Sequence, residues 1–180
     1  LYSAGTVINN ANINYGSGVG NVGIYSINGG TASNSGGASI TVGASSVGNP
    51  NPSDNYYAIG MAAGYYGDAS SPAYTGNILN SGTINVTGEN SIGMYGTESG
   101  TTVTNNGIIN LSASNTVGMY LDNGAYGINN GIIQSSGSGL KRIVGVVVKN
   151  GSTIENNGTI QINAEEAVGL AAKGNAAGRN

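Results

Sequence analysis

A repeat of about 25 residues runs along the chain and restricts it to folds built from stacked, similar units. Each copy opens with Asn-x-Gly and continues into alternating apolar residues, most clearly at residues 80–86, 105–111, 129–133 and 156–162. Subtracting the positions of the motif glycines (82, 107, 131 and 158) gives differences of 25, 24 and 27. Looser copies begin at Asn9 and Asn34. Six copies in a fixed order indicate a repeat architecture.

A second motif follows each copy and consists of a β-branched residue, a glycine and an apolar residue. Its glycines are Gly23, Gly60, Gly93, Gly118, Gly145 and Gly169. Short alternating apolar segments between Gly and Asn turns are typical of β-strands. A unit of this length matches one coil of a β-solenoid. We therefore expect an all-β fold of about six coils of roughly 25 residues, stacked at about 4.8 Å per coil.

Stacking predicts columns of equivalent side chains along the rod. We expect Ile84, Ile109, Ile133 and Ile160 to form one interior column. The motif Asn residues are expected to form a hydrogen-bonded turn ladder, as Asn side chains do in cross-β structures. The Gly of the second motif is expected to meet a demand for space at a corner of the coil.

Composition excludes several function classes. The chain has no Cys and no His, 7% charged residues and a formal net charge of −3. It therefore lacks thiol chemistry, the commonest general base and a basic surface for nucleic acid. No segment approaches the roughly 20 apolar residues that span a membrane. The repeat is cut at both ends, which predicts that residues 1–180 are a single solenoid fragment of a longer protein.

Two coils are longer than the others. The difference in position between successive second-motif glycines is 37 from Gly23 to Gly60 and 33 from Gly60 to Gly93, against 25, 27 and 24 later. The extra residues lie at about 44–57 and 63–75, and insertions in solenoids emerge as corner loops. Tyr beside Ser, Gly and Asn is typical of recognition surfaces. The candidate binding residues are Tyr56, Tyr57, Tyr65, Tyr66, Asp68 and Tyr74.

A second set of tyrosines follows the second motif at Tyr25, Tyr95 and Tyr120. Alternation along a strand predicts that these rings point outward and stack. For both sets, an equally open interpretation is that the rings only cover the side of the rod.

Catalysis is weighed against the placement of charged residues. A β-helix enzyme needs carboxylates, or a carboxylate with a base, at neighbouring positions of consecutive coils. Glu98 and Asp122 are one repeat apart in sequence and offer at most a cation site, although two solvated turn acids are the better interpretation. The one basic pair, Lys141-Arg142, has no acid nearby in sequence. We predict no catalytic residue, no metal site and no cofactor.

The repeats at residues 80–95, 105–120 and 156–170 resemble those of fusobacterial-type passenger domains of large type V autotransporter adhesins. The resemblance implies a right-handed parallel β-helix outside the outer membrane. It also implies binding to a host-cell receptor or glycan, or to the surface of another bacterium. Heads of trimeric autotransporters are similar at residues 90–93, but their repeat is much shorter.

Three functions stay open. The first is a surface adhesin segment that makes contacts through the Tyr- and Pro-containing loops, without nucleic-acid binding or membrane insertion. The second is a passive stalk that presents another binding domain. The third, least favoured, is a carbohydrate-active β-helix enzyme.

Overall fold

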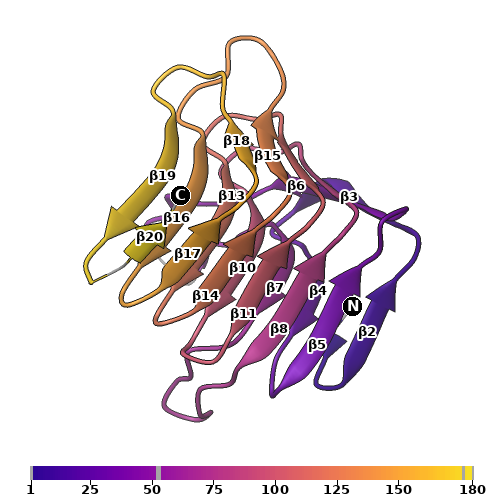
Figure 1. Ribbon diagram of the computed structural model, residues 1–180, viewed down its shortest axis with the longest axis vertical. Helices are drawn as coiled ribbons and strands as arrows, with labels where there is room; N and C mark the ends of the chain where they lie inside the picture. Colours follow the sequence, from indigo (N-terminus) through magenta and orange to yellow (C-terminus); the bar gives the residue numbers. More distant parts are fainter. Residues whose placement is uncertain (1, 52–53, 176, 180) are drawn as a thin grey trace.

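The computed structural model describes residues 2–51, 54–175 and 177–179, which form parallel strands in three sheets and no α-helix (Figure 1). Sheet A contains β1 (Tyr2–Ser3), β4 (Val22–Ser26), β7 (Ile59–Ala63), β10 (Ile92–Thr97), β13 (Val117–Asp122), β16 (Val144–Lys149) and β19 (Val168–Lys173). Sheet B contains β2 (Thr6–Asn9), β5 (Gly30–Asn34), β8 (Gly76–Asn80), β11 (Thr102–Asn105), β14 (Tyr126–Asn129), β17 (Thr153–Asn156) and β20 (Ala177–Arg179). Sheet C contains β3 (Asn12–Val19), β6 (Ser39–Ala44), β9 (Thr83–Val86), β12 (Ile108–Leu111), β15 (Ile132–Ser135) and β18 (Thr159–Gln161).

Each turn of the chain visits sheet A, then sheet B, then sheet C, and the next turn stacks on it in register. In sheet A, for example, Met94 pairs with Met61 on one side and with Met119 on the other. The chain is thus a parallel β-helix of about six turns, as the repeat predicts. The same described residues include no helix of the length and apolarity that a membrane crossing requires.

The predicted isoleucine column exists and forms part of the core. On neighbouring strands of sheet C, Ile84 pairs with Ile109 and Ile109 with Ile133, and all three are fully buried. Ile160 continues the column as a partly buried residue. A second core column runs along sheet A from coil to coil and contains Ile24, Met61, Met94, Met119 and Val146. Strands buried on one inner face and paired above and below enclose the core without helices.

The predicted asparagine ladder runs inside the corner between sheets B and C. From Asn9 to Asn129, each side-chain amide donates to the side-chain oxygen of its counterpart one coil further on, at 2.7–2.9 Å, and Asn156 accepts the last of these bonds; the members are Asn9, Asn34, Asn80, Asn105, Asn129 and Asn156. Asn34, Asn80, Asn105 and Asn129 are fully buried. Because buried amides are costly unless they are bonded, the unbroken ladder satisfies groups that no water reaches.

The glycine of the second motif is required by space, as predicted, in every copy except Gly169, where a Cβ would meet nothing within 4 Å. A Cβ on Gly93 would lie 2.6 Å from the carbonyl oxygen of Gly118 and 2.8 Å from Ile109 Cγ2. The same contacts recur at Gly118, where Gly145 and Ile133 are the neighbours. The corner therefore brings sheet A so close to the sheet C isoleucines that no side chain fits.

Candidate functional site

The first insertion joins β6 to β7 at the corner between sheets C and A. Ser46 and Tyr56 close it as an antiparallel pair, with N–H···O distances of 2.9 and 2.8 Å. The Asn49 side chain bridges its interior by donating to the Asp54 carbonyl at 2.8 Å. Tyr56 and Tyr57 are 56% and 52% exposed. Residues 52–53, which the predicted segment 44–57 includes, lie outside the described residues.

The second insertion joins β7 to β8 at the opposite end of β7, between sheets A and B. Tyr65 and Tyr74 close it through two hydrogen bonds of 2.8 Å. The Asp68 carboxylate accepts hydrogen bonds from the Tyr65 hydroxyl and from Ser70 N (2.7 Å) and Ser71 N (2.9 Å). Asp68 thus holds the loop in shape.

The three tyrosines of this second loop lie side by side. Tyr65 stacks on Tyr66 at 5.7 Å between ring centroids and on Tyr74 at 6.5 Å. Tyr66 stands at the outer end of this row and is 68% exposed. Of the six predicted binding residues, Tyr65, Asp68 and Tyr74 mainly build a loop, whereas Tyr66, Tyr56 and Tyr57 present most of their surface to solvent.

The Tyr65–Asp68 hydrogen bond shifts both ionisations. Hydrogen bonds from Tyr65 and Ser70 hold the pKa of Asp68 well below its usual range, and the bond to Asp68 raises the pKa of Tyr65 to about 12. The hydrogen bonds to the ionised Asp68 carboxylate stabilise the loop fully when the pH is above the ordinary Asp pKa of about 3.9. This stabilisation is lost as the pH falls through the lowered pKa. The hydrogen bond from the protonated Tyr65 hydroxyl stabilises the loop fully when the pH is below the ordinary tyrosine pKa of about 10. This stabilisation is lost as the pH rises through about 12.

We therefore expect the contacts of this loop to stay constant between about pH 4 and pH 10. The measurement is NMR of the Ser70 and Ser71 backbone amides, whose shifts should remain flat over that range. Asp68→Asn is the control and should move both amide shifts at neutral pH. A titration of either amide with a midpoint near pH 4 would show that the Asp68 interactions are not formed.

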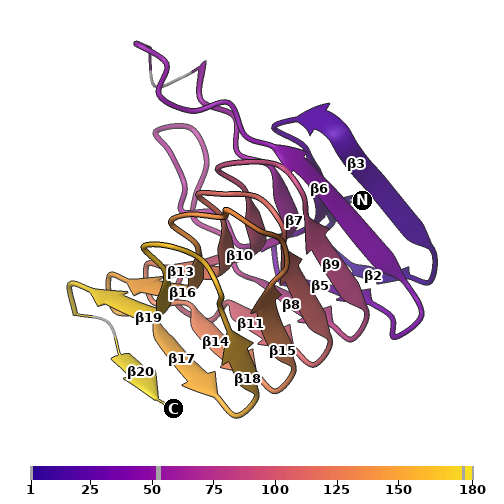
Figure 2. The same ribbon diagram turned by 90° about the horizontal axis from the view of Figure 1, so that it is seen from above.

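The two loops flank one face of the rod, although they leave opposite ends of β7. Figure 2 shows both loops projecting on the side of sheet A, away from sheet B. The loop at 44–57 borders a groove of about 270 Å³, here called the Tyr57 groove, lined by Val47, Tyr57, Asn90, Ser91, Ile92, Asn115, Val117 and Tyr120. The loop at 63–75 borders a groove of about 290 Å³, here called the Tyr66 groove, lined by Tyr66, Tyr95, Thr97, Asp122, Asn123 and Asn150. Both grooves lie over β10 and β13.

The outward tyrosine column connects the two grooves. Tyr95 and Tyr120 are paired in sheet A, with ring centroids 5.9 Å apart and a tilt of 32°. The predicted stack does not reach Tyr25, because Ala62 occupies the intervening coil. The Tyr25 hydroxyl donates instead to the carbonyl of Gly64, at the base of the second loop (2.9 Å). Tyr95 and Tyr120 therefore form a floor of two rings between the grooves, and Tyr25 supports the loop at 63–75.

Charged groups at the end of this floor are paired. Lys149 Nζ lies 3.6 Å from Asp122 Oδ2, donates to the Tyr120 hydroxyl at 3.0 Å and sits 5.6 Å from the centre of that ring. The bond to Tyr120 raises the pKa of Lys149. Asp122 also accepts from Asn150 Nδ2 at 2.7 Å. The Tyr66 groove thus carries polar groups with little net charge.

The two acids considered as a cation site are not stacked on each other. Asp122 pairs in register with Thr97, and Glu98 accepts a hydrogen bond from Asn123. In the ranges that the structure describes, no three acidic side chains gather as metal ligands would. Glu98 is thus bonded to an amide, and Asp122 is paired with a lysine.

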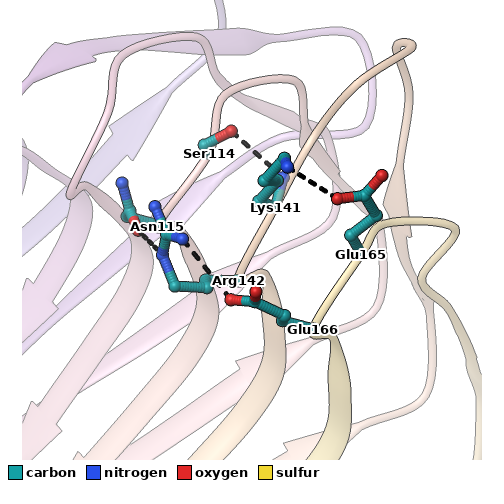
Figure 3. A network of polar contacts seen from close by, with 6 residues as sticks. All are labelled: Ser114, Asn115, Lys141, Arg142, Glu165 and Glu166. Carbon is teal, nitrogen blue, oxygen red and sulfur yellow. Dashed lines mark hydrogen bonds and ion pairs between the residues drawn. The ribbon is translucent and has the colours of Figure 1, made fainter.

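The basic pair has acidic partners that sequence proximity does not reveal (Figure 3). Lys141 Nζ lies 2.7 Å from Glu165 Oε2, and Arg142 Nη1 lies 3.4 Å from Glu166 Oε2, one coil further on. Arg142 Nε also donates to Asn115 Oδ1 at 2.7 Å. These side chains are exposed, and such surface pairs contribute little to stability. The network joins three corners and places a carboxylate beside a base on consecutive coils, which sequence proximity alone does not predict, in the form of exposed ion pairs.

A larger groove of about 680 Å³ follows the Asn-x-Gly corner but is built from stacked backbone and amides. Its exposed amides bond one another, with Asn130 donating to Asn106 at 2.9 Å and Asn157 to Asn130 at 3.0 Å. A Cβ on Gly107 would lie 2.0 Å from the Gly82 carbonyl oxygen. This groove is thus a consequence of coil stacking.

Sequence reasoning missed Asn123 and Asn150 of the Tyr66 groove and weighed Asp122 only as one acid of a cation site. Asn123 and Asn150 are turn residues with positive φ angles of 55° and 47°, so the turns alone explain their types, whereas Asp122 is the last residue of β13. Their common position at one corner of consecutive coils was the available signal.

Comparison with known proteins gives one family. A family model described as the BigA third pectate lyase-like domain matches residues 2–131. The match covers more than half of the chain and includes both insertions and both grooves except Asn150. No curated protein and no solved structure matched the chain.

Proposed function

Because the chain belongs to the family of the BigA third pectate lyase-like domain, a β-helix domain of a bacterial surface protein, we propose that it is an adhesin segment. In this proposal the rod stands outside the outer membrane as part of an autotransporter passenger. It attaches the cell to a host-cell receptor or glycan, or to another bacterium. The face of sheet A between the two loops makes the contact.

The observation that carries this proposal is the placement of the two insertions. Toward the following coil the strands beside them keep their register, since Val42 pairs with Val86 and Ile59 with Ile92. The loops are therefore additions to a coil that stacks without them. Both lie on the side of sheet A, and each brings an exposed tyrosine to a groove over β10 and β13. Exposed tyrosines on rigid supports supply contact area at low entropic cost.

A passive stalk is the second candidate, favoured by the many repeated residues that only build the rod. The asparagine ladder, the glycine corners and the isoleucine column all stabilise stacking. These features do not explain the two loops, which contribute no residue to the ladder or to that column. We propose no catalytic activity, because the acid of the Tyr66 groove is held by Lys149 and Asn150 and no second acid is among the described residues that line that groove.

Exchange of each loop for a short corner of the same protein tests the adhesin proposal. Residues 43–58 are replaced by the shorter segment 87–91, which occupies the equivalent corner between Val86 and Ile92. Residues 64–76 are replaced by the shorter segment 97–101, which lies between Gly96 and Thr102. We expect each exchange to reduce adhesion of cells displaying the chain at least tenfold, which corresponds to about 1.4 kcal/mol.

Circular dichroism and thermal unfolding of each exchanged chain are the controls for fold. Tyr15→Ala, on sheet C, is the control for loss of an exposed ring elsewhere on the rod. Full adhesion by a chain that lacks both loops would contradict the loop contact, and absence of adhesion by cells that display the parent chain would favour the passive stalk. Turnover of a polysaccharide by the purified chain would contradict the non-enzymatic part of the proposal.

A further inference from the structure

We propose that the Tyr66 groove is a subsite for one uncharged pyranose ring of a glycan. This inference rests on the proposed adhesin function and names the class of ligand that one part of the contact face would take. The groove is lined by two tyrosines, a threonine, an aspartate and two asparagines.

The aromatic part of the groove is held in place before any ligand arrives. Tyr66 is 68% exposed, and its ring is fixed against Tyr65, which Asp68 and Tyr74 hold in turn. Tyr95 lies on a sheet strand and contacts Tyr120 at 5.9 Å. Little side-chain entropy is therefore lost on binding, and preorganised aromatic surface of this kind favours affinity. The C–H face of a pyranose ring is apolar and suits such a surface.

The polar part of the groove lies at the ends of β10 and β13 and in the neighbouring turns. Asp122 supplies a carboxylate, and Asn123 and Asn150 supply amides, whereas Thr97 is buried and its side chain bonds Tyr95. Carboxylates accept hydrogen bonds, whereas amides both donate and accept them. Hydroxyl groups around the edge of a sugar ring need donors and acceptors of this mixed kind. Asp122 is kept in position by Asn150 at 2.7 Å and by Lys149 at 3.6 Å.

Charge and size favour an uncharged sugar over other ligands. Asp122 is the one charged residue among the described residues that line the groove, and its carboxylate is balanced by Lys149, while Glu98, bonded to the Asn123 amide beside the groove, keeps its negative charge and disfavours an acidic ligand. Its volume of about 290 Å³ is at the small end for ligand sites and suits one ring rather than a helix. The strands beneath it are paired on both sides in sheet A, so no strand edge is open for a peptide.

The test screens the 180-residue chain on an array of neutral, N-acetylated and sialylated oligosaccharides. Saturation-transfer NMR is then measured with the neutral glycan that binds best. We expect Tyr66→Ala to weaken that binding about tenfold or more, as loss of an aromatic anchor does at interfaces. Tyr66→Phe, which keeps the ring, should bind within about twofold of the parent. Asp122→Asn should weaken binding at least fivefold. Tyr15→Ala should leave it unchanged.

The outcomes separate this inference from the adhesin proposal. Adhesion that depends on the second loop and persists on cells whose surface glycans have been oxidised by periodate would overturn the glycan subsite and leave the adhesin function standing. Binding only to sialylated glycans would overturn the uncharged ligand. Glycan binding that Tyr66→Ala leaves intact would place the subsite elsewhere. Self-association in sedimentation that Tyr66→Ala abolishes, without glycan binding, would assign the groove to a second copy of the chain.

Discussion

Replacement of Asn105 by leucine is expected to lower the free energy of unfolding by about 2–4 kcal/mol, because each buried polar group that loses its partner costs about 1–3 kcal/mol. Asn105 is fully buried, accepts from Asn80 Nδ2 at 2.8 Å and donates to Asn129 Oδ1 at 2.8 Å. Leucine has a similar shape, so the change removes hydrogen bonds and leaves little cavity. Asn80 keeps a longer bond to the Gly82 carbonyl at 3.3 Å, which limits the loss.

Chemical denaturation of the purified chain measures this effect. Asn106→Leu is the matched control, since Asn106 is the adjacent residue in the same turn but is exposed. We expect the control to change stability by less than about 0.5 kcal/mol. Equal losses for the two variants would mean that the buried ladder contributes no more than its exposed counterpart.

Gly118→Ala is expected to lower the free energy of unfolding by about 3 kcal/mol, at the upper end of the cost of overpacking. The added Cβ would lie 2.5 Å from the Gly145 carbonyl oxygen and 2.6 Å from Ile133 Cγ2. One neighbour is backbone and the other is a fully buried side chain, so neither moves without disturbing the next coil.

Gly37→Ala is the control for the same atomic change. A Cβ at Gly37 meets nothing within 4 Å, and this glycine does not have a positive φ. Its substitution should leave stability unchanged or raise it by up to about 1 kcal/mol, since alanine restricts the unfolded chain. If Gly118→Ala were as stable as Gly37→Ala, the glycine of the second motif would not be a requirement of the corner.

Much of the fold was predictable from sequence because parallel stacking in register converts spacing along the chain into position in space. Residues one coil apart become neighbours, so the alignment of Ile84, Ile109 and Ile133 in the repeat already describes a core column. The same rule finds the partners of the basic pair. Lys141 and Glu165, like Arg142 and Glu166, are one repeat apart, although neither acid is near in sequence.

The candidate site was less predictable because its geometry depends on where the repeat is interrupted. The insertions locate the loops but do not give the direction in which they project. The position of Tyr66 over β10 and β13 follows from stacking among Tyr65, Tyr66 and Tyr74.

Alternation along the strands predicts an outward tyrosine column, but Ala62 divides this column and leaves Tyr95 and Tyr120 as a pair. Asp68 was grouped with the contact residues, whereas its hydrogen bonds are within the loop.

The strands that flank each insertion keep their register with the following coil, and this has a consequence for how such rods acquire new properties. The same corner is short where it joins Val86 to Ile92 and long where it joins Val42 to Ile59, and the flanking strands still pair. A lengthened corner leaves the pairing with the following coil in register, so we expect gain or loss of a loop to be nearly independent of folding. Lineages of such proteins can therefore exchange contact loops by insertion and deletion at corners, while point substitution of ladder and glycine positions stays under the constraint of the stack.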